Sequence, residues 1–215
     1  MSIKNSPTFT AKERPPLPDE VYPGIYVGPK STVNQYAIDH IGIKIVINCA
    51  KKIPNLVPEF AKSYVDYYHL EIVDSIDQSL KGFINIGAKL IKEGLDQNGR
   101  ILVHCEAGKS RSVSMVLSYL LEYTNTSLAD ALAEIQQNRP CASPNIRFLR
   151  DLGEYEIIKK GNSSLDLRNV SIVYLNGYFP TLTKETIEDY YNRFYDLQHE
   201  NDLNLIAEKI CQEIY

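Results

Sequence analysis

The chain has 215 residues, 44% of them hydrophobic, which suffices for one domain with an ordinary core and an appendage. Its formal net charge of −4 gives no electrostatic support for a nucleic-acid partner. The first residues lack the apolar core of a signal peptide, and no apolar run reaches the ~20 residues that span a bilayer. We therefore expect the protein to be located in the cytoplasm, with the nucleus as an alternative location, and to have no membrane partner.

Residues 1–18 are polar and contain prolines, which predicts a flexible N-terminal arm. The RPPLP segment at residues 14–18 is extended by composition, so it suits docking to a proline-reading domain. The alternative is that these prolines form only a stiff linker that precedes the folded part and binds no partner.

Between residues 19 and 160, apolar extended runs alternate with amphipathic helical patterns. This alternation predicts an α/β fold with a central, twisted, mostly parallel sheet of about five strands and helices on both faces. We expect strands at residues 25–28, 43–48, 65–73 and 101–105, and helices at 79–97, 110–123, 127–138 and 143–160.

Residues 161–215 form an acidic, tyrosine-rich C-terminal extension with four Lys or Arg against nine Asp or Glu. We expect it to be mixed but mainly helical, with a strand at 169–175 and two amphipathic helices capped by Thr183 and Asp202. Their apolar stripes need a surface to cover. Packing on the preceding domain is favoured because the linker is short, and self-association through residues 165–215 or a partner protein are the alternatives.

The cysteines lie far apart and form no CxxC pair; they are Cys49, Cys105, Cys141 and Cys211. Without a secretory signal, this spacing is typical of reduced thiols and argues against a disulfide framework or a zinc site. We expect no metal and no other cofactor.

The segment ILVHCEAGKSRS, residues 101–112, places a thiol and a guanidinium where a strand gives way to a helix. Cys105 ends the strand at the edge where open α/β sheets hold their sites. The small residues that follow let N–H groups converge at a helix N-terminus, which binds a tetrahedral oxyanion and lowers the pKa of a thiol. Arg111 can hold two phosphate oxygens with its planar fork. The alternative is a buried cysteine that lies beside an unrelated arginine. This alternative is disfavoured because a strand, His-Cys, a glycine-containing turn, an arginine, a hydroxyl and a helix rarely occur together by chance.

The stretch HCEAGKSRS, residues 104–112, resembles the HCxxGxxR signature of the cysteine-dependent protein tyrosine phosphatases. Its AGxSRS form is most similar to the dual-specificity branch, above all to the catalytic domains of MAP kinase phosphatases. The resemblance runs over residues 19–158, through GIYVGP, GIKIVINCAKKIPN, YYHLEIVD and ASPNIRFLRDLGEYE. It implies a protein tyrosine phosphatase-like fold, with a catalytic domain at residues 19–160.

The resemblance also implies a role for each residue of the signature. Cys105 is the nucleophile that forms a phosphocysteine intermediate. His104 helps to keep the thiolate ionised, and the hydroxyl of Ser112 assists its departure in the second step. The phosphate is bound by the side chain of Arg111 and by the backbone of Glu106, Ala107, Gly108, Lys109, Ser110 and Arg111.

Two carboxylates compete for the role of general acid. Asp74 matches the family's acid, which protonates the leaving oxygen and later activates water. Asp77 lies in the same loop, but Asp74 is favoured because it directly follows the extended run. Asn145 resembles the family's asparagine that steadies the phosphate loop, and an ordinary polar residue of the first helical turn explains it equally well.

The expected activity is metal-independent dephosphorylation of phosphotyrosine and of phosphoserine or phosphothreonine in proteins. Alternatives are a phosphoinositide or phosphoglucan phosphatase, and a phospho-binding module with little turnover. Lys109 stands where phosphoinositide phosphatases carry a lysine, but Glu106 replaces a basic residue there and opposes a polyanionic substrate. Residues 1–18 carry no convincing basic docking motif for a MAP kinase.

Cys49 ends the strand expected at residues 43–48, on the same sheet edge as Cys105. A neighbouring thiol there can trap an oxidised Cys105 as a disulfide, which makes Cys49 a possible redox partner. A small buried core residue is the commoner state of a free cysteine and is favoured.

Overall fold

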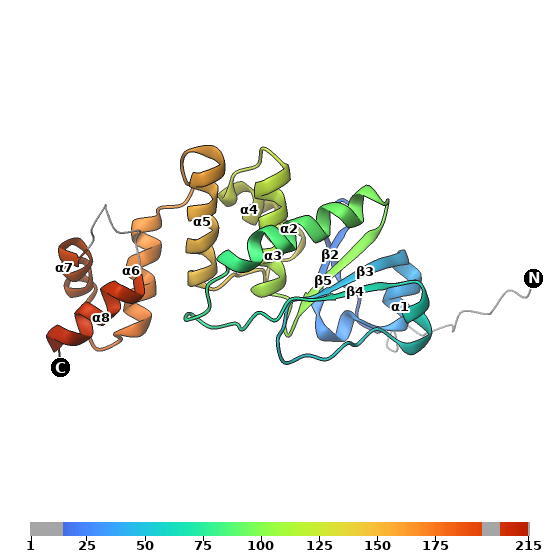
Figure 1. Cartoon of the computed structure of the whole chain (residues 1–215), viewed down its shortest axis with the longest axis horizontal. Helices are drawn as coiled ribbons and strands as arrows, with labels where there is room; N and C mark the ends of the chain where they lie inside the picture. Colours follow the sequence, from blue (N-terminus) through green and yellow to red (C-terminus); the bar gives the residue numbers. More distant parts are fainter. Residues whose placement is uncertain (1–14, 195–202, 215) are drawn as a thin grey trace, which may run out of the picture.

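The structure is a computed structural model that describes residues 15–194 and 203–214. An α/β domain forms the N-terminal part, and a helical extension forms the opposite end of the elongated chain (Figure 1). The elements are β1 (Asp19–Tyr22), β2 (Ile25–Pro29), α1 (Gln35–Ala37), β3 (Ile43–Asn48), β4 (Asp66–His69), α2 (Lys81–Asp96), β5 (Arg100–Cys105), α3 (Arg111–Tyr123), α4 (Leu128–Asn138), α5 (Ile146–Lys160), α6 (Leu167–Tyr178), α7 (Lys184–Phe194) and α8 (Leu203–Ile214).

The five strands form one sheet in the order β1-β2-β5-β3-β4. Only β1 runs antiparallel to its neighbour, so the sheet is mixed but mostly parallel, as expected. The central strand β5 pairs with β2 and β3, and its Ile101, Leu102 and Val103 are fully buried. A continuous apolar run is typical of a strand covered on both faces, so the composition of β5 agrees with its central position in the sheet.

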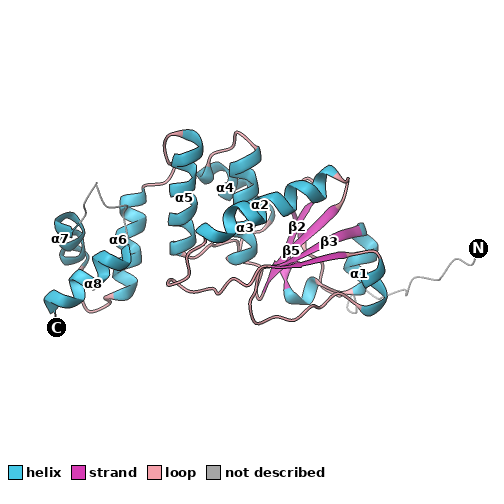
Figure 2. Ribbon diagram, in the orientation of Figure 1, coloured by secondary structure: helices cyan, strands magenta, loops and turns pink. Residues whose placement is uncertain are grey.

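Helices cover both faces of the sheet, which confirms the expected fold class (Figure 2). The main core lies between one face and α2 to α5, with α3 packed lengthwise on α2. A smaller core on the other face joins α1 and the short helical turn at Glu59–Ser63 to residues that include Val46 and Leu102. No helix in the described parts of the chain combines the length and the apolar character needed to cross a membrane.

The prediction of a strand at residues 169–175 is wrong, because this segment lies inside helix α6. The side chain of Asp166 caps the helix by accepting the N–H of Asn169 at 3.0 Å. Ile172 and Leu175 are buried on one side, whereas Val173 is 49% exposed. The apolar run therefore follows the helical period, and the regular elements in the described part of the extension are the helices α6, α7 and α8.

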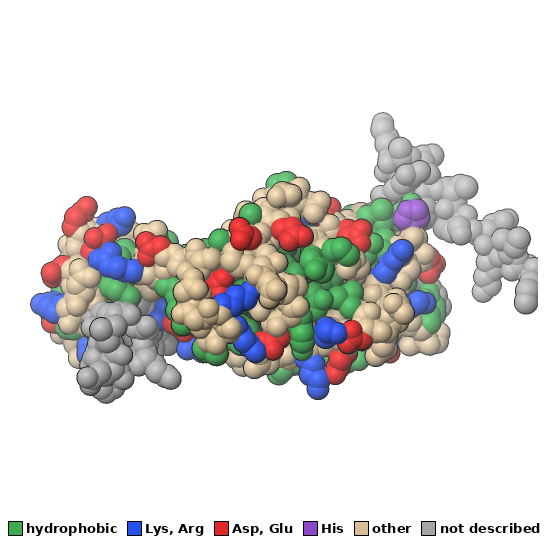
Figure 3. Space-filling model, turned by 90° about the horizontal axis from the view of Figure 1, so that it is seen from above, with side chains coloured by type: hydrophobic (Ala, Val, Ile, Leu, Met, Phe, Trp, Pro, Cys, Tyr) green, Lys and Arg blue, Asp and Glu red, His purple; other side chains and the backbone are tan. Residues whose placement is uncertain are grey.

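The extension packs on the preceding domain of the same chain, as favoured from the short linker. Its three helices share a core that includes Tyr174, Ile187 and Ile210, and Ile76 and Ile146 of the preceding domain pack against it. On the face shown in Figure 3, Lys and Arg side chains lie among Asp and Glu over the C-terminal helices. Thr183 caps α7, since its Oγ1 accepts the N–H of Thr186. The predicted cap at Asp202 and most of the predicted arm at residues 1–18 lie outside the described residues.

Candidate active site

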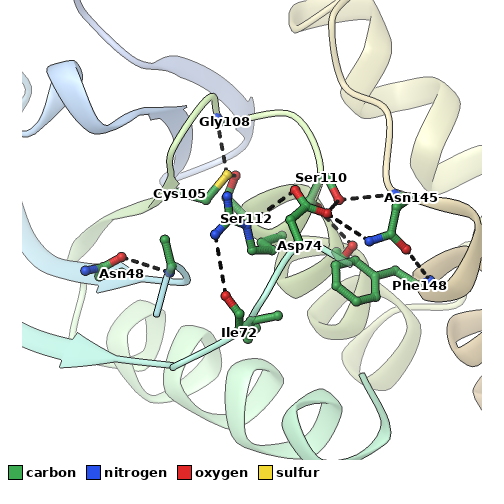
Figure 4. Close-up of polar contacts among 12 residues, drawn as sticks. Asn48, Ile72, Asp74, Cys105, Gly108, Ser110, Ser112, Asn145 and Phe148 are labelled. Carbon is green, nitrogen blue, oxygen red and sulfur yellow. Dashed lines mark hydrogen bonds and ion pairs between the residues drawn. The ribbon is translucent and has the colours of Figure 1, made fainter. Parts of the chain in front are cut away.

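The loop between β5 and α3 surrounds the sulfur of Cys105 (Figure 4). Cys105 is buried at the end of β5, and its Sγ accepts the N–H of Gly108 at 3.2 Å. The hydroxyl of Ser112, in the first turn of α3, lies 3.3 Å from the same sulfur. The strand, the turn and the helix start thus gather polar hydrogens around one thiol.

The carbonyl groups of this loop are held from outside. The carbonyl of Glu106 accepts the N–H of Lys30 at 3.2 Å, and the carbonyl of Lys109 accepts the N–H of Ser143 at 2.8 Å. In a trans peptide the N–H points away from the preceding carbonyl. Carbonyls anchored outward therefore turn the following N–H groups inward, which is the arrangement that binds an anion.

Arg139 also holds the loop from outside, and no sequence pattern predicted this role. Its Nε and Nη2 donate to the carbonyls of Gly108 and Ala107 at 2.6 and 3.1 Å. Its Nη1 is paired with Asp19 of β1 at 2.5 Å. Arg139 is nearly buried, so its planar fork ties the loop to the first strand of the sheet.

Gly108 is required by the backbone of the loop. Its φ of +65° lies in the left-handed region, which side chains other than glycine rarely adopt. A Cβ at this position would meet the carbonyl carbon of Gly28 at 2.4 Å. The glycine of the signature therefore allows the loop to pass against β2.

The surroundings of Cys105 favour the thiolate. Burial raises the pKa of the thiol, but hydrogen bonds from the Ser112 hydroxyl and N–H, the charge of Arg111 and the Gly108 N–H act against it. The pKa of Cys105 ends below the ordinary value for cysteine. The site thus holds a nucleophilic sulfur next to anion-binding donors.

His104 lies beneath the loop as a neutral ring. It is fully buried on β5, and burial lowers its pKa to about 4. Burial outweighs the opposing effect of the backbone contact with Cys105. The influence of His104 on the thiolate, expected from the resemblance, therefore cannot come from a positive charge near neutral pH.

Asp74 faces the loop across the site. Its Oδ1 accepts the hydroxyl of Ser110 and the Nδ2 of Asn145, each at 2.8 Å. Its Oδ2 lies 3.4 Å from Nε of Arg111, whose Nη1 donates to the carbonyl of Ile72 at 3.5 Å. The arginine is 13% exposed at its side chain, so it lies inside the site rather than on the surface.

Asp77 turns away from this group of residues. Its carboxylate accepts the hydroxyls of Ser75 and of Tyr178 on α6. The structure therefore separates the two candidates for general acid: Asp74 lies beside Arg111, and Asp77 lies against the extension.

Asn145 joins the site and also begins a helix. Its Oδ1 caps α5 by accepting the N–H of Phe148 at 3.0 Å, so the helix begins after Asn145 rather than at Ser143. Its own N–H donates to the hydroxyl of Ser110 at 3.1 Å. The side chain of Asn145 thus caps the helix and contacts Asp74, while its backbone N–H contacts the loop.

The charge of Glu106 at the mouth of the loop is paired. Its carboxylate lies 2.5 Å from Nζ of Lys30, and both side chains are 52% exposed. We expected the negative charge of Glu106 to oppose polyanionic substrates. The neighbouring cation of Lys30 partly offsets that charge.

Cys49 lies next to β5, directly after β3. Its N–H donates to the carbonyl of His104 at 2.8 Å, and its side chain is fully buried. Burial raises the pKa of Cys49 well above the ordinary value, and the adjacent Cys105 raises it further. All four cysteines are free thiols.

A family model described as "Dual specificity phosphatase, catalytic domain" matches residues 25–158, more than half of the chain. The chain belongs to the dual-specificity phosphatase family. It is 31% identical to dual specificity protein phosphatase 6 of Homo sapiens over 147 residues, which are 68% of this chain and 38% of that one. With dual specificity protein phosphatase 9 of Homo sapiens, the identity is 31% over 66% of this chain and 37% of the relative. The chain thus spans little more than a third of these relatives.

Solved structures of similar proteins agree with the phosphatase fold. Human DUSP28 aligns with a TM-score of 0.62 at 23% identity, over 67% of this chain and 96% of that one. The human tyrosine phosphatase-like serine/threonine/tyrosine-interacting protein aligns with a TM-score of 0.59 at 31% identity, over 66% and 96%. Across the described part of this phosphatase-family chain, no three His, Cys, Asp or Glu side chains cluster as a metal site requires.

Proposed function

We propose that the chain dephosphorylates phosphotyrosine, and phosphoserine or phosphothreonine, in proteins through a phosphocysteine intermediate. The observation that carries this proposal is the lowered pKa of Cys105 inside a loop whose N–H groups turn inward, with Arg111 and Asp74 beside it. An ionised sulfur and an anion site at the same point suit attack on a bound phosphoryl group.

In the first step, the Cys105 thiolate attacks phosphorus while the bond from phosphorus to the substrate oxygen breaks. Arg111 and the loop backbone hold the three remaining phosphoryl oxygens. Asp74 gives its proton to the leaving oxygen, so the alcohol or phenol departs neutral.

In the second step, water attacks the phosphocysteine and Asp74 accepts its proton. The bond from sulfur to phosphorus breaks, and inorganic phosphate leaves with the thiolate restored. Ser112 supports this departure, because its hydroxyl lies 3.3 Å from the sulfur and can donate to the thiolate as charge returns to it.

A phospho-binding module is the alternative from another class. One structural relative is named as a phosphatase-like interacting protein, which makes the alternative relevant. The intact set of Cys105, Arg111 and Asp74 supports turnover, because binding alone needs no nucleophile and no acid.

Protein substrates are favoured over inositol lipids and glucans, although the pairing of Glu106 with Lys30 weakens one argument for them. A comparison of rates on phosphopeptides, phosphoinositides and phosphoglucan with the same enzyme preparation would separate these classes. The free thiols suit a reducing compartment such as the cytoplasm or nucleus.

The proposal is tested by turnover of an aryl phosphate. We expect hydrolysis that vanadate blocks and chelators leave unchanged. Cys105→Ser should abolish turnover and keep phosphopeptide binding, since the loop donors remain. Activity lost on chelation, or activity retained by Cys105→Ser, would contradict the mechanism.

A further inference from the structure

The loop that carries Asp74 is anchored at both ends within the catalytic domain. At its start, the N–H of Leu70 donates to the carbonyl of Asn48 at 2.7 Å. At its end, the N–H of Leu80 and the hydroxyl of Ser79 donate to one carboxylate oxygen of Asp151 on α5, at 2.6 and 3.0 Å. Between these anchors lies the segment at residues 73–78, which contains Asp74.

The middle of this loop is held by the C-terminal extension. The hydroxyl of Tyr174 donates to the carbonyl of Ile76 at 3.2 Å, and the hydroxyl of Tyr178 donates to the carboxylate of Asp77. Ile76 also packs against the core of the extension. Among the described residues, the hydrogen bonds that leave residues 75–78 for another element go to α6.

The two tyrosines are themselves fixed in place. Tyr174 is 1% exposed, and its ring lies 6.0 Å from the guanidinium of Arg147 and 5.3 Å from the ring of Tyr178. Arg147 is paired with Asp151, the residue that anchors the end of the loop. The loop, α5 and α6 therefore form one connected set of contacts.

A general acid acts only from a narrow range of positions, because the proton must travel along a hydrogen bond to the leaving oxygen. A displacement of about 1 Å can cost two orders of magnitude in rate. Asp74 lies two residues from Ile76 and three from Asp77, so contacts at those residues limit where its carboxylate can move. The hydroxyl of Tyr178 donates to the side chain of Asp77, so this residue is tied directly to α6.

We propose that the extension positions the general acid of the catalytic domain through Tyr174 and Tyr178. These two tyrosines are positioning residues: they act on the loop and not on the substrate. The inference rests on the proposed function, and it gives the extension a part in the reaction beyond covering apolar surface.

The test compares two substrates that differ in their need for a proton. Phenyl phosphate releases a strongly basic phenolate and depends on the acid, whereas 2,4-dinitrophenyl phosphate releases a weakly basic one. For the double variant Tyr174→Phe/Tyr178→Phe, we expect kcat on phenyl phosphate to fall about tenfold or more, a part of the full effect of an acid. On 2,4-dinitrophenyl phosphate we expect a change of less than about twofold, because that leaving group needs no acid.

Tyr190→Phe is the matched control, because Tyr190 lies in the same extension and its ring stacks on Phe194 rather than on the loop. A second variant, Asp77→Ala, removes the acceptor from the loop side and should show the same dependence on the leaving group. This arm leaves the helices of the extension unchanged, so it holds even where the double variant is unstable in thermal melts.

Equal losses on both substrates, or no loss on either, would overturn the inference. Absence of turnover of both substrates by the unaltered chain would instead overturn the proposed function, so the two failures are distinct.

Discussion

Ser110 joins the phosphate loop to the opposite wall of the site, because its hydroxyl donates to Oδ1 of Asp74 at 2.8 Å. The contact brings together two segments that lie far apart in the sequence. It also places the candidate acid beside Arg111, where a phosphate would bind.

Replacement of the acid should separate Asp74 from Asp77. We expect Asp74→Asn to lower kcat on phenyl phosphate by about 10²–10⁴-fold, the usual contribution of a general acid. Asp77→Asn should cost far less, since its amide oxygen can still accept from Tyr178. Steady-state kinetics would measure both, and a larger loss in Asp77→Asn would show that the assignment is wrong.

Arg139→Met should destabilise the loop between β5 and α3, because Arg139 holds the loop carbonyls on the side away from Cys105. The substitution leaves the carbonyls of Ala107 and Gly108 without their donors, and we expect a loss of about 2–3 kcal/mol in the free energy of unfolding. Binding of vanadate should weaken as well. Urea unfolding and inhibition curves would measure the two effects. The control is Arg193→Met, which removes an exposed pair with Glu213 and should cost about 1 kcal/mol or less.

Gly108→Ala should abolish activity through the backbone. The added Cβ would meet the carbonyl carbon of Gly28 at 2.4 Å, and the φ of +65° disfavours alanine. Gly82→Ala, in α2 with nothing within 4 Å of its added Cβ, is the matched control. If Gly108→Ala kept normal kcat/KM, the loop would not need its left-handed residue.

His104 should make the free energy of unfolding depend on pH in the acidic range. Its pKa is about 4 when folded and about 6.5 when unfolded, so the unfolded chain binds more protons between these values. Stability is therefore lost as pH falls below about 6.5, by about 2 kcal/mol at pH 5. Urea unfolding at pH 7 and pH 5 would give the free energy of unfolding at each pH. Between these pH values, His104→Asn should lose about 2 kcal/mol less of this free energy than the unaltered chain. The same pH dependence in both proteins would contradict the lowered pKa.

Cys49 should behave as a core residue. Burial disfavours its thiolate, which is the form that attacks an oxidised sulfur. We expect Cys49→Ala to recover from peroxide on addition of thiol as the unaltered chain does. Slower or incomplete recovery would instead make Cys49 the partner that traps Cys105 as a disulfide.

The sequence predicted those parts of the fold whose signals are local. The strand that ends at Cys105, the glycine turn and the helix at Arg111 follow one another within a few residues, and their composition matches their burial. The run at residues 169–175 failed because its apolar residues suit either a strand or a helix. There, the cap at Asp166 and the packing of Ile172 and Leu175 decide for the helix.

Contacts between distant residues could not be predicted in this way. Nothing near Arg139 marks it as the donor to the loop carbonyls, and nothing near Tyr178 marks it as a partner of Asp77. Both side chains reach their partners only after α4 and α6 are placed on the domain. Asp74 and Asp77 likewise look alike in sequence and differ only in which neighbours the folded chain gives them.

The most direct test of the account is capture of the phosphocysteine. Ser112→Ala removes the hydroxyl that lies 3.3 Å from the sulfur, so the second step should slow and the intermediate should accumulate. After rapid mixing with 2,4-dinitrophenyl phosphate and acid quench, mass spectrometry should find one phosphoryl group on the peptide that contains Cys105. Turnover without any phosphorylated Cys105, or with the phosphoryl group on another residue, would contradict the account.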